Sequence, residues 1–375
     1  MAIKLLSDLV TVVSEHISNP STSGFEIFVG LEHYDAGEPV ITRFGSTANL
    51  ESSVKHFIEG DILVARRNVY LKRAGVVKFE GVTSGDSIVL RVKDECYKDI
   101  IPFILNTEEF WDYAEQNSDG TMSKRLAPDV LLEYECDIPD NHKDIAKKLW
   151  AAYELKEAYK KMIAATDEMV KSQFIEMFYN GKYTVDKLRE HIDVIRGVSY
   201  KPSDVYETHN ENTSIVLRSN NIEGGQINFD DLVYVSTERV SELQLLRVGD
   251  IVMCGSNGSK KLVGKAAMLQ ETPTIRTSFG AFCLGIRCKP TLVPEYLATY
   301  FQTSLYRDEI EQLGSGSNIL NIKPDHIYDL EVPIPLYDEQ MAFVSIVRQA
   351  DKSEFELRKS IEAIDQVIKS LINNK

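Results

Sequence analysis

Residues 60–75 read GDILVARRNVYLKRAG, and residues 249–264 read GDIVMCGSNGSKKLVG. The two stretches share six identities at one constant offset of 189 residues. The shared positions are Gly60, Asp61, Ile62, Asn68, Lys72 and Gly75, which fall on Gly249, Asp250, Ile251, Asn257, Lys261 and Gly264. Self-similarity at a fixed offset indicates a duplicated structural unit, so the pair predicts that the chain builds one fold twice.

A second pair of matching segments follows further along the chain. Residues 126–139 (LAPDVLLEYECDIP) align with residues 322–335 (IKPDHIYDLEVPIP) at an offset of 196. A long stretch of helix-forming composition comes after each of them. The order of unit then helix therefore occurs twice. We predict a first globular unit at 1–140, a helix at 141–180, a second unit at 181–336 and a helix at 337–375.

Each predicted unit is rich in short β-branched runs, such as SIVLRV at 87–92, that are separated by Gly, Asn, Ser and Pro. Such runs are typical of short strands joined by loops. Smaller helices are expected at 108–116 and 294–306. The predicted fold class is therefore α+β, with two similar mixed α/β units separated by two long helices.

Apolar residues in both long helices recur at alternating spacings of four and three. They are Ala151, Leu155, Ala158, Met162, Ala165, Met169 and Ser172 in the first helix, and Phe343, Val347, Ala350, Glu354 (the one polar break), Leu357, Ile361, Ile364, Ile368 and Leu371 in the second. This period is typical of a coiled-coil seam, and the repeat favours antiparallel pairing of the two helices. About 34 helical residues at ~1.5 Å each would separate the units by roughly 50 Å. The alternative is that each helix packs only on its own unit.

Composition sets the broad class of protein. The 375 residues are 43% hydrophobic and 26% charged, which is typical of a globular chain and excludes disorder. The chain has no apolar run of ~18 residues and no basic signal-peptide segment at its start, so we expect a cytoplasmic location. Five cysteines spread over this length predict reduced, structural thiols. The net charge of −15 argues against a protein that coats nucleic acid through bulk charge, but it leaves room for a local basic patch.

Two matched loops supply such patches. Residues 60–80 and residues 247–276 each hold five basic and two acidic side chains. Arg and Asn can form paired hydrogen bonds with bases, whereas Lys and Ser suit phosphates. The candidates for DNA contact are Arg66, Arg67, Asn68, Tyr70, Lys72 and Arg73 in the first loop, Asn257, Ser259, Lys260, Lys261 and Lys265 in the second, and Ser123, Lys124, Arg125, Arg218, Asn220, Asn221, Ser315, Ser317 and Asn318 elsewhere. The alternative is an ordinary solvated basic loop.

The second unit carries a run of motifs that match a known family. In order they are Gly249-Asp250-Ile251, Gly264-Lys265, Gly314-Ser315-Gly316-Ser317-Asn318-Ile319-Leu320, Pro333-Ile334-Pro335-Leu336 and Glu339-Gln340. Together with the opening at 187–205, these motifs resemble the specificity subunit of type I restriction–modification systems. The first unit fits more loosely, because Lys143-Asp144 stands where the Glu-Gln pair is expected.

The resemblance implies two target recognition domains that each read one half of a bipartite double-stranded DNA site. It implies that the antiparallel coiled coil fixes the gap between the halves and docks two methyltransferase subunits, with restriction and motor subunits joining the assembly. This subunit would be no enzyme and would hold no cofactor. S-adenosylmethionine, ATP and Mg are then expected only in the partner subunits.

Enzyme interpretations find little support. Pro128-Asp129 followed by Glu154-Leu155-Lys156 imitates a metal-dependent nuclease, but Leu155 lies on the predicted seam, so its neighbours would flank a helix interface. The Gly-Ser run at 314–317 lacks the Gly-Lys-Ser/Thr ending of a nucleotide-binding loop. No zinc spacing or catalytic histidine pattern occurs. A non-catalytic coiled-coil scaffold that binds other proteins without reading DNA remains the alternative.

Overall fold

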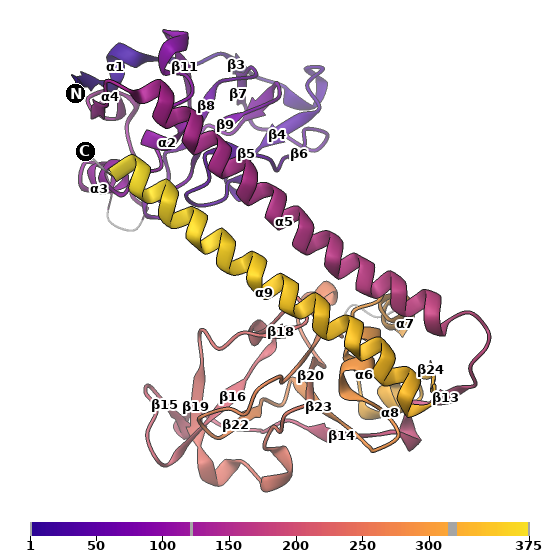
Figure 1. The fold of residues 1–375 in the computed structure, drawn as a ribbon. Coiled ribbons are helices and arrows are strands. Elements are labelled where there is room, and N and C mark those ends of the chain that lie inside the picture. The colour runs from indigo at the N-terminus through magenta and orange to yellow at the C-terminus, as the bar shows by residue number, and fades with distance from the viewer. Residues whose placement is uncertain (1, 121–122, 314–320, 374–375) are drawn as a thin grey trace. The chain divides into compact units, whose positions relative to one another are not determined.

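The computed structural model of the chain describes residues 2–120, 123–313 and 321–373. These residues form two compact units, one made of Met1–Lys160 with Arg358–Lys375 and one made of Lys161–Leu357 (Figure 1). Each of the two long helices is therefore divided between the units. The four-segment division expected from the sequence stays a prediction.

The first unit is built on a mixed sheet with helices packed against one face. The strand order is β2 (Val10–Val13), β11 (Ser87–Val92), β8 (Ile62–Ala65), β9 (Ala74–Val77) and β5 (Val40–Ile41). A second sheet has the order β3 (His16–Ile17), β7 (Val54–Phe57), β10 (Gly81–Thr83), β4 (Ile27–Val29) and β6 (Gly45–Ser46). The remaining elements are the pair β1 (Ala2–Leu5) and β12 (Glu135–Ile138), and the helices α1 (Leu6–Leu9), α2 (Ile101–Ile104), α3 (Glu108–Gln116) and α4 (Pro128–Leu132).

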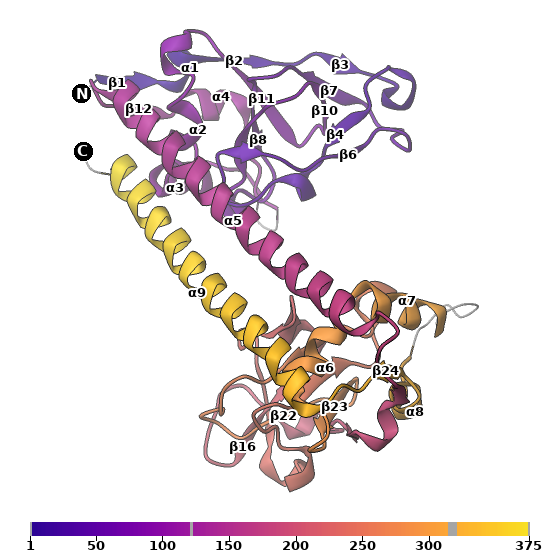
Figure 2. The ribbon, with the colours of Figure 1, turned by 45° about the vertical axis from the view of Figure 1, so that its right-hand side comes forward.

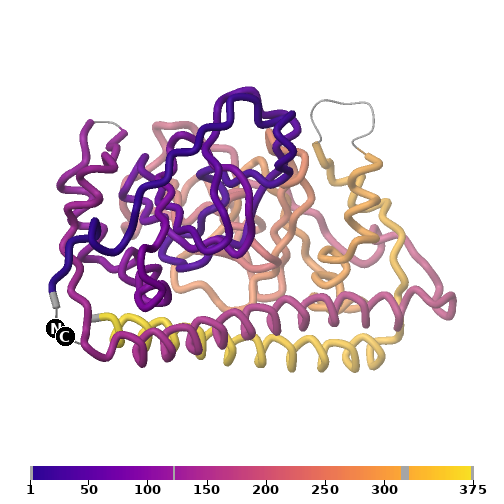
Figure 3. The backbone as a smooth tube through the Cα atoms, turned by 90° about the horizontal axis from the view of Figure 1, so that it is seen from above, coloured from indigo at the N-terminus to yellow at the C-terminus, as the bar shows by residue number. Residues whose placement is uncertain are grey.

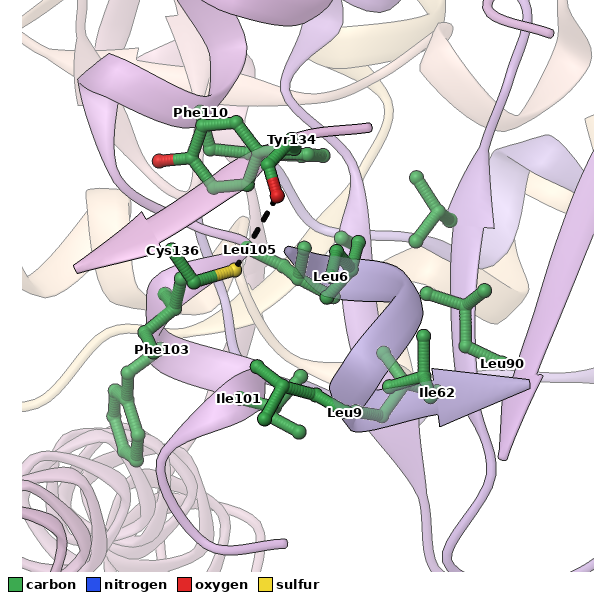
Figure 4. Close-up of a cluster of buried hydrophobic side chains, with 14 of the residues drawn as sticks. Leu6, Leu9, Ile62, Leu90, Ile101, Phe103, Leu105, Phe110, Tyr134 and Cys136 are labelled. Atoms are coloured by element: carbon green, nitrogen blue, oxygen red, sulfur yellow. Dashed lines mark hydrogen bonds between the residues drawn. The ribbon is translucent and has the colours of Figure 1, made fainter. Parts of the chain in front are cut away.

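Strand β8 shows why this sheet forms. Its four residues are all buried, and they alternate between two cores, with Ile62 and Val64 on one face and Leu63 and Ala65 on the other. A strand that is apolar at every position is expected where both faces of a sheet are covered. Figure 4 shows the helical side of this core, where α1 packs against the sheet.

The second unit repeats the plan of the first. Its main sheet has the order β14 (Ile192–Arg196), β23 (Cys283–Cys288), β20 (Ile251–Cys254) and β21 (Ala266–Met268), and its second sheet has β15 (Val205–Tyr206), β19 (Val233–Ser236), β16 (Thr213–Leu217) and β22 (Thr277–Phe279). The other elements are the pairs β13 (Val185–Lys187) with β24 (Glu331–Pro333) and β17 (Ile222–Glu223) with β18 (Gln226–Ile227), and the helices α6 (Pro294–Tyr300), α7 (Ser304–Leu313) and α8 (Pro324–Tyr328).

The duplication is confirmed at the level of single residues. Gly60 and Gly249 both have a φ of 89°, a left-handed conformation that favours glycine. The aspartate that follows each glycine is buried and bonded to an arginine, Arg91 in the first unit and Arg287 in the second. The Gly-Asp-Ile tripeptide thus encodes a turn, an ion pair and the start of a strand in both units.

Each long helix has 37 residues, α5 from His142 to Phe178 and α9 from Tyr337 to Asn373. In the first unit Lys156 of α5 lies against Asp365 of α9, with 2.7 Å between Nζ and Oδ1. In the second unit the rings of Phe174 and Phe343 lie 5.4 Å apart. In both units an early part of one helix therefore meets a late part of the other, so the helices are antiparallel, as expected (Figures 2 and 3).

Burial along the two helices agrees with the predicted seam positions in α9 and contradicts them in α5. In α9, Phe343 is buried, and Leu357, Ile361, Ile364, Ile368 and Leu371 are all half-buried. In α5, the predicted seam residues Ala151, Leu155, Ala158, Met162, Ala165 and Met169 are all exposed. The buried positions of α5 are instead Ala146, Leu149, Tyr153, Val170, Phe174 and Phe178.

The physical reason is a charged residue inside the true interface. The side chain of Lys156 is only 12% exposed because it is bonded to carboxylates on both sides. The buried positions fall one or two residues after the predicted ones, as Val170 does after Met169 and Phe174 after Ser172, which is about 100° to 200° around a helix. Two faces of one helix can share the same apolar period, and the period alone does not say which of them is buried.

Other expectations have mixed outcomes. The helix expected at 108–116 is confirmed as α3, whereas the one expected at 294–306 is two helices, α6 and α7. The break falls at Thr303, whose hydroxyl accepts a hydrogen bond from the Tyr306 backbone N–H at 3.3 Å and so caps α7. The five cysteines are free thiols. Within the described part of the chain, no helix combines the length and the apolar character that crossing a membrane requires.

Candidate nucleic-acid interface

In the first unit, the loop after β8 crosses the segment at 123–125. Arg67 and Arg125 form an isolated antiparallel bridge, and the Asn68 backbone N–H donates to the Lys124 carbonyl at 2.9 Å. Two groups of candidate residues that lie more than 50 positions apart in sequence therefore come together at one place.

The carboxylate of Asp86 lies between the two arginines. It is 3.6 Å from Arg67 Nη1 and 3.4 Å from Arg125 Nη2. Both arginine side chains stay about half exposed, at 45% and 53%. The site thus presents two oriented cations and one carboxylate. Asp86 could not be predicted as part of this site, because an aspartate in a Ser-Gly-Asp turn is common on any surface.

Hydrogen bonds hold this loop crossing in place. Arg67 Nε donates to Ser123 Oγ at 3.0 Å, and Ser123 Oγ donates to Asn68 Oδ1 at 3.0 Å. Asn68 has a φ of 55°, in the left-handed region that asparagine tolerates better than most residues. The chain of polar contacts fixes the orientation of Arg67 before any ligand arrives.

The other candidates in this unit differ in their surroundings. Arg73 donates to the carbonyls of Leu31 and Arg67, and burial lowers the pKa of its guanidinium, so it supports the loop from within. Lys72 is paired with Glu108 on α3, and Lys124 donates to the Glu115 carbonyl at 2.9 Å.

The last two candidates of this loop, Tyr70 and Arg66, differ in exposure. Tyr70 is 55% exposed. Arg66 is half-buried, and its Nε has no hydrogen-bond partner among the described residues.

The second unit has the equivalent loop crossing. Ser256 and Asn321 form an isolated antiparallel bridge, and they stand at the offsets of 189 and 196 from Arg67 and Arg125. Beside it, Asn257 Nδ2 donates to Ser219 Oγ at 3.0 Å. The architecture of the crossing is therefore repeated while the side chains on it differ.

A second polar group in this unit is centred on Asp231. Arg218 Nη2 and Asn220 Nδ2 both donate to its Oδ2 at 2.8 Å. Asn221 is buried and bonded to the backbone of Arg218 and Asn228, so its role is structural. Asp231, like Asp86, was not anticipated.

The remaining candidates fall into two groups. Ser259, Lys260, Lys261 and Lys265 lie within or beside the loop that follows β20, and all but the half-buried Lys265 are exposed. Ser315, Ser317 and Asn318 lie outside the described residues. The assignment of individual residues to bases or phosphates stays a prediction.

The imitation of a nuclease motif does not assemble. Lys156 Nζ is engaged by Glu38 at 2.9 Å and by Asp365 at 2.7 Å, while Glu154 is exposed on α5. Across residues 2–120, 123–313 and 321–373, no group of three or more His, Cys, Asp or Glu side chains is arranged to hold a metal ion.

Comparison with known proteins supports the resemblance seen in the motifs. The chain is 36% identical over 180 residues to the type I restriction enzyme StySPI specificity subunit of Salmonella potsdam and 35% identical over 180 residues to the EcoKI specificity subunit of Escherichia coli K12. Each match spans 47% of this chain and 38% of the relative, so the chain covers well under half of their length. The MjaVIII specificity subunit of Methanocaldococcus jannaschii is 20% identical over 319 residues, which is 78% of this chain and 73% of that protein.

The fold has relatives among solved structures. One, from a study of complex assembly and conformational transition of a type I restriction–modification system, aligns over 99% of this chain and 96% of its own, with a TM-score of 0.55 and 15% identity. The type I specificity subunit from M. genitalium aligns over 99% and 94%, with a TM-score of 0.52 and 14% identity. At these identities the likeness establishes the fold alone. No protein-family model matches the chain.

Proposed function

We propose that this chain is the DNA sequence-specificity subunit of a type I restriction–modification complex and that each unit reads one half of a bipartite site. The observation that carries the proposal is the repeated loop crossing, Arg67 with Arg125 in one unit and Ser256 with Asn321 in the other. One backbone frame displaying different side chains is what two readers of different half-sites require. The curated relatives, all type I specificity subunits, support the same function.

In this proposal the chain is not an enzyme. Methylation is carried out by methyltransferase subunits, and restriction and motor subunits can join them. S-adenosylmethionine, ATP and Mg then belong to those partners, and the complex works in the cytoplasm. The exposed Leu155, Met162 and Met169 of α5 stand seven residues apart, a spacing that suits the docking of a helix from a methyltransferase subunit.

The test begins in the source cell. Methylation mapping with and without this gene should reveal a split recognition sequence that is methylated only when the gene is present. The purified chain, assembled with type I methyltransferase subunits, should then bind a duplex that carries this sequence more tightly than a duplex with either half scrambled. Equal binding to all duplexes would favour the alternative of a scaffold that does not read DNA.

A further inference from the structure

The second unit contains a cavity of about 450 Å³ beside the loop that follows β20. Its walls come from α5, from the loop that holds Lys261 and Lys265, and from the stretch that connects α6 with the start of α7. Four basic side chains and one acidic side chain line it, namely Lys171, Lys261, Lys265, Arg307 and Glu168.

Two of these cations have no counter-charge among the residues that the structure describes. Lys171 is paired with Asp167 at 2.7 Å and with Glu168 at 2.9 Å. Glu168, the acidic residue of the lining, is therefore already bound to Lys171. Within the described ranges, the side chains of Lys261 and Lys265 make no ion pair or hydrogen bond, although Lys265 is half-buried. A partly buried ammonium without a partner is costly, so the cavity favours an anion.

The fourth cation, Arg307, is held in place by an ion pair and a hydrogen bond to a carbonyl. Arg307 Nε donates to Glu311 at 3.1 Å, and its Nη1 donates to the Val263 carbonyl at 2.8 Å. Its guanidinium is thereby oriented at the wall of the cavity while Glu311 lies outside the lining.

The equivalent positions of the first unit carry a different charge. The repeat offsets place Lys72, Val76, Glu108 and Trp111 opposite Lys261, Lys265, Ser304 and Arg307. In the first unit these four positions sum to zero charge, because Lys72 is paired with Glu108. In the second unit the formal charges of the four positions add up to +3. Ser304 replaces the carboxylate of Glu108, and the cations Lys265 and Arg307 replace the uncharged Val76 and Trp111.

We propose that this cavity takes one backbone phosphate of the duplex bound by the second unit, an inference that rests on the proposed function. Lysine binds phosphate as a point charge, and the cavity volume is large enough for a phosphodiester group. Lys261 lies four residues after Asn257, so the loop that carries these candidate contacts also forms a wall of the cavity. The first unit, with its internal ion pair, has no such contact at this place.

The experiment measures duplex affinity against salt for the full chain assembled with its methyltransferase subunits. Lys261→Gln and Lys265→Gln should each reduce the slope of log affinity against log salt by about 0.9 and weaken cognate and scrambled duplexes alike. Ser304→Glu, which restores the carboxylate of the first unit, should have the same effect. Lys182→Gln, an exposed lysine of the same unit outside the cavity, is the control of equal charge and should leave the slope unchanged.

Each outcome has one meaning. Unchanged slopes in all three cavity variants, with sequence-dependent binding retained, would overturn the phosphate site and leave the proposed function standing. Weakened assembly with methyltransferase at unchanged DNA affinity would show that the cavity receives an acidic protein side chain instead. Failure of the unaltered complex to bind any duplex would overturn the proposed function and this site with it. Thermal unfolding of each variant checks that a loss of DNA affinity does not come from a loss of folded protein.

Discussion

Asp61 and Arg91 form a two-bonded ion pair, with Arg91 Nε donating to Oδ1 at 2.8 Å and Nη2 donating to Oδ2 at 2.7 Å. Asp250 and Arg287 repeat the same two bonds at the same distances. Each aspartate also accepts a backbone N–H three residues before it, from Ile58 at 2.9 Å in the first pair. The pair thus ties the turn before the central strand to the neighbouring strand in both units.

Replacing either aspartate should destabilise its unit. Asp250→Asn should cost about 3 kcal/mol of unfolding free energy, because it leaves the guanidinium of Arg287, only 18% exposed, without its counter-charge. Asp61→Asn should cost less, about 2 kcal/mol, since Arg91 is 36% exposed and solvent compensates more of the loss. Urea unfolding measures both. Glu242→Gln, which removes an exposed ion pair with Arg276 at 2.8 Å in the second unit, is the control and should change stability by less than about 0.5 kcal/mol.

The stability of the first unit should depend on pH through His56. Its Nδ1 lies 2.8 Å from Glu15 and its Nε2 lies 2.8 Å from Glu80. Burial by itself lowers the pKa of His56, but the two carboxylates outweigh it and hold the pKa above its ordinary value of 6.5. Because the pKa of His56 is raised on folding, protonated His56 stabilises the folded state fully at pH values below 6.5. This stabilisation is lost as pH rises through the pKa of His56 in the folded state. Unfolding of the unaltered chain should therefore become easier from neutral to mildly alkaline pH, and His56→Gln should remove that dependence. An identical pH profile in the two proteins would contradict the assignment.

The first loop crossing should read only one half of the recognition site. Arg67→Ala should relax base discrimination at that half by about 1–3 kcal/mol, because a two-bonded contact with a base is lost. Competition binding with duplexes altered in one half at a time measures this. Arg43→Ala, which removes an exposed arginine paired with Asp35 in the same unit, should leave both halves unchanged. Equal weakening of both halves would refute the division of reading between the units.

Asp86 should restrain the same site. Because its carboxylate attracts both Arg67 and Arg125, Asp86→Asn should raise duplex affinity by about threefold at low salt, the amount that a partly exposed ion pair is worth. The gain should vanish at high salt, where exposed charges are screened. A loss of affinity would instead mean that Asp86 is needed to orient the arginines.

The helix pair should set the gap between the half-sites. Seven residues inserted after Lys160 and seven after Leu357, where each helix passes from one unit to the other, keep the apolar register and lengthen both helices by about 10 Å. The preferred gap should grow by about three base pairs. A library of duplexes with different gaps measures the shift, and an unchanged gap would count against the role of a ruler.

The sequence predicted the duplicated units well, because they repeat the same motifs. It predicted less well which side of the helix α5 is buried. Matching Gly-Asp-Ile segments required the same turn in both units, and the structure has it at Gly60 and Gly249. The seam on α5 was misplaced because Lys156, a charged residue, lies in the interface that apolar spacing was used to find. Asp86 was not predicted, because it joins the site through ion pairs with Arg67 and Arg125, and Arg125 is distant from it in sequence. The cavity around Lys265 was hidden for the same reason, since α5, the loop and α7 meet only in the folded chain.

Because α5 and α9 each contribute one part to each compact unit, neither unit contains a complete long helix. Melting the core around Phe174 and Phe343 removes the packing of half of both helices, and the same is true at Tyr153 and Ile368 in the other unit. Most of the stability of a helix in a protein comes from tertiary packing rather than from its own propensity. Thermal unfolding of the two units is therefore coupled, because loss of packing in one unit frays the helices that also support the other.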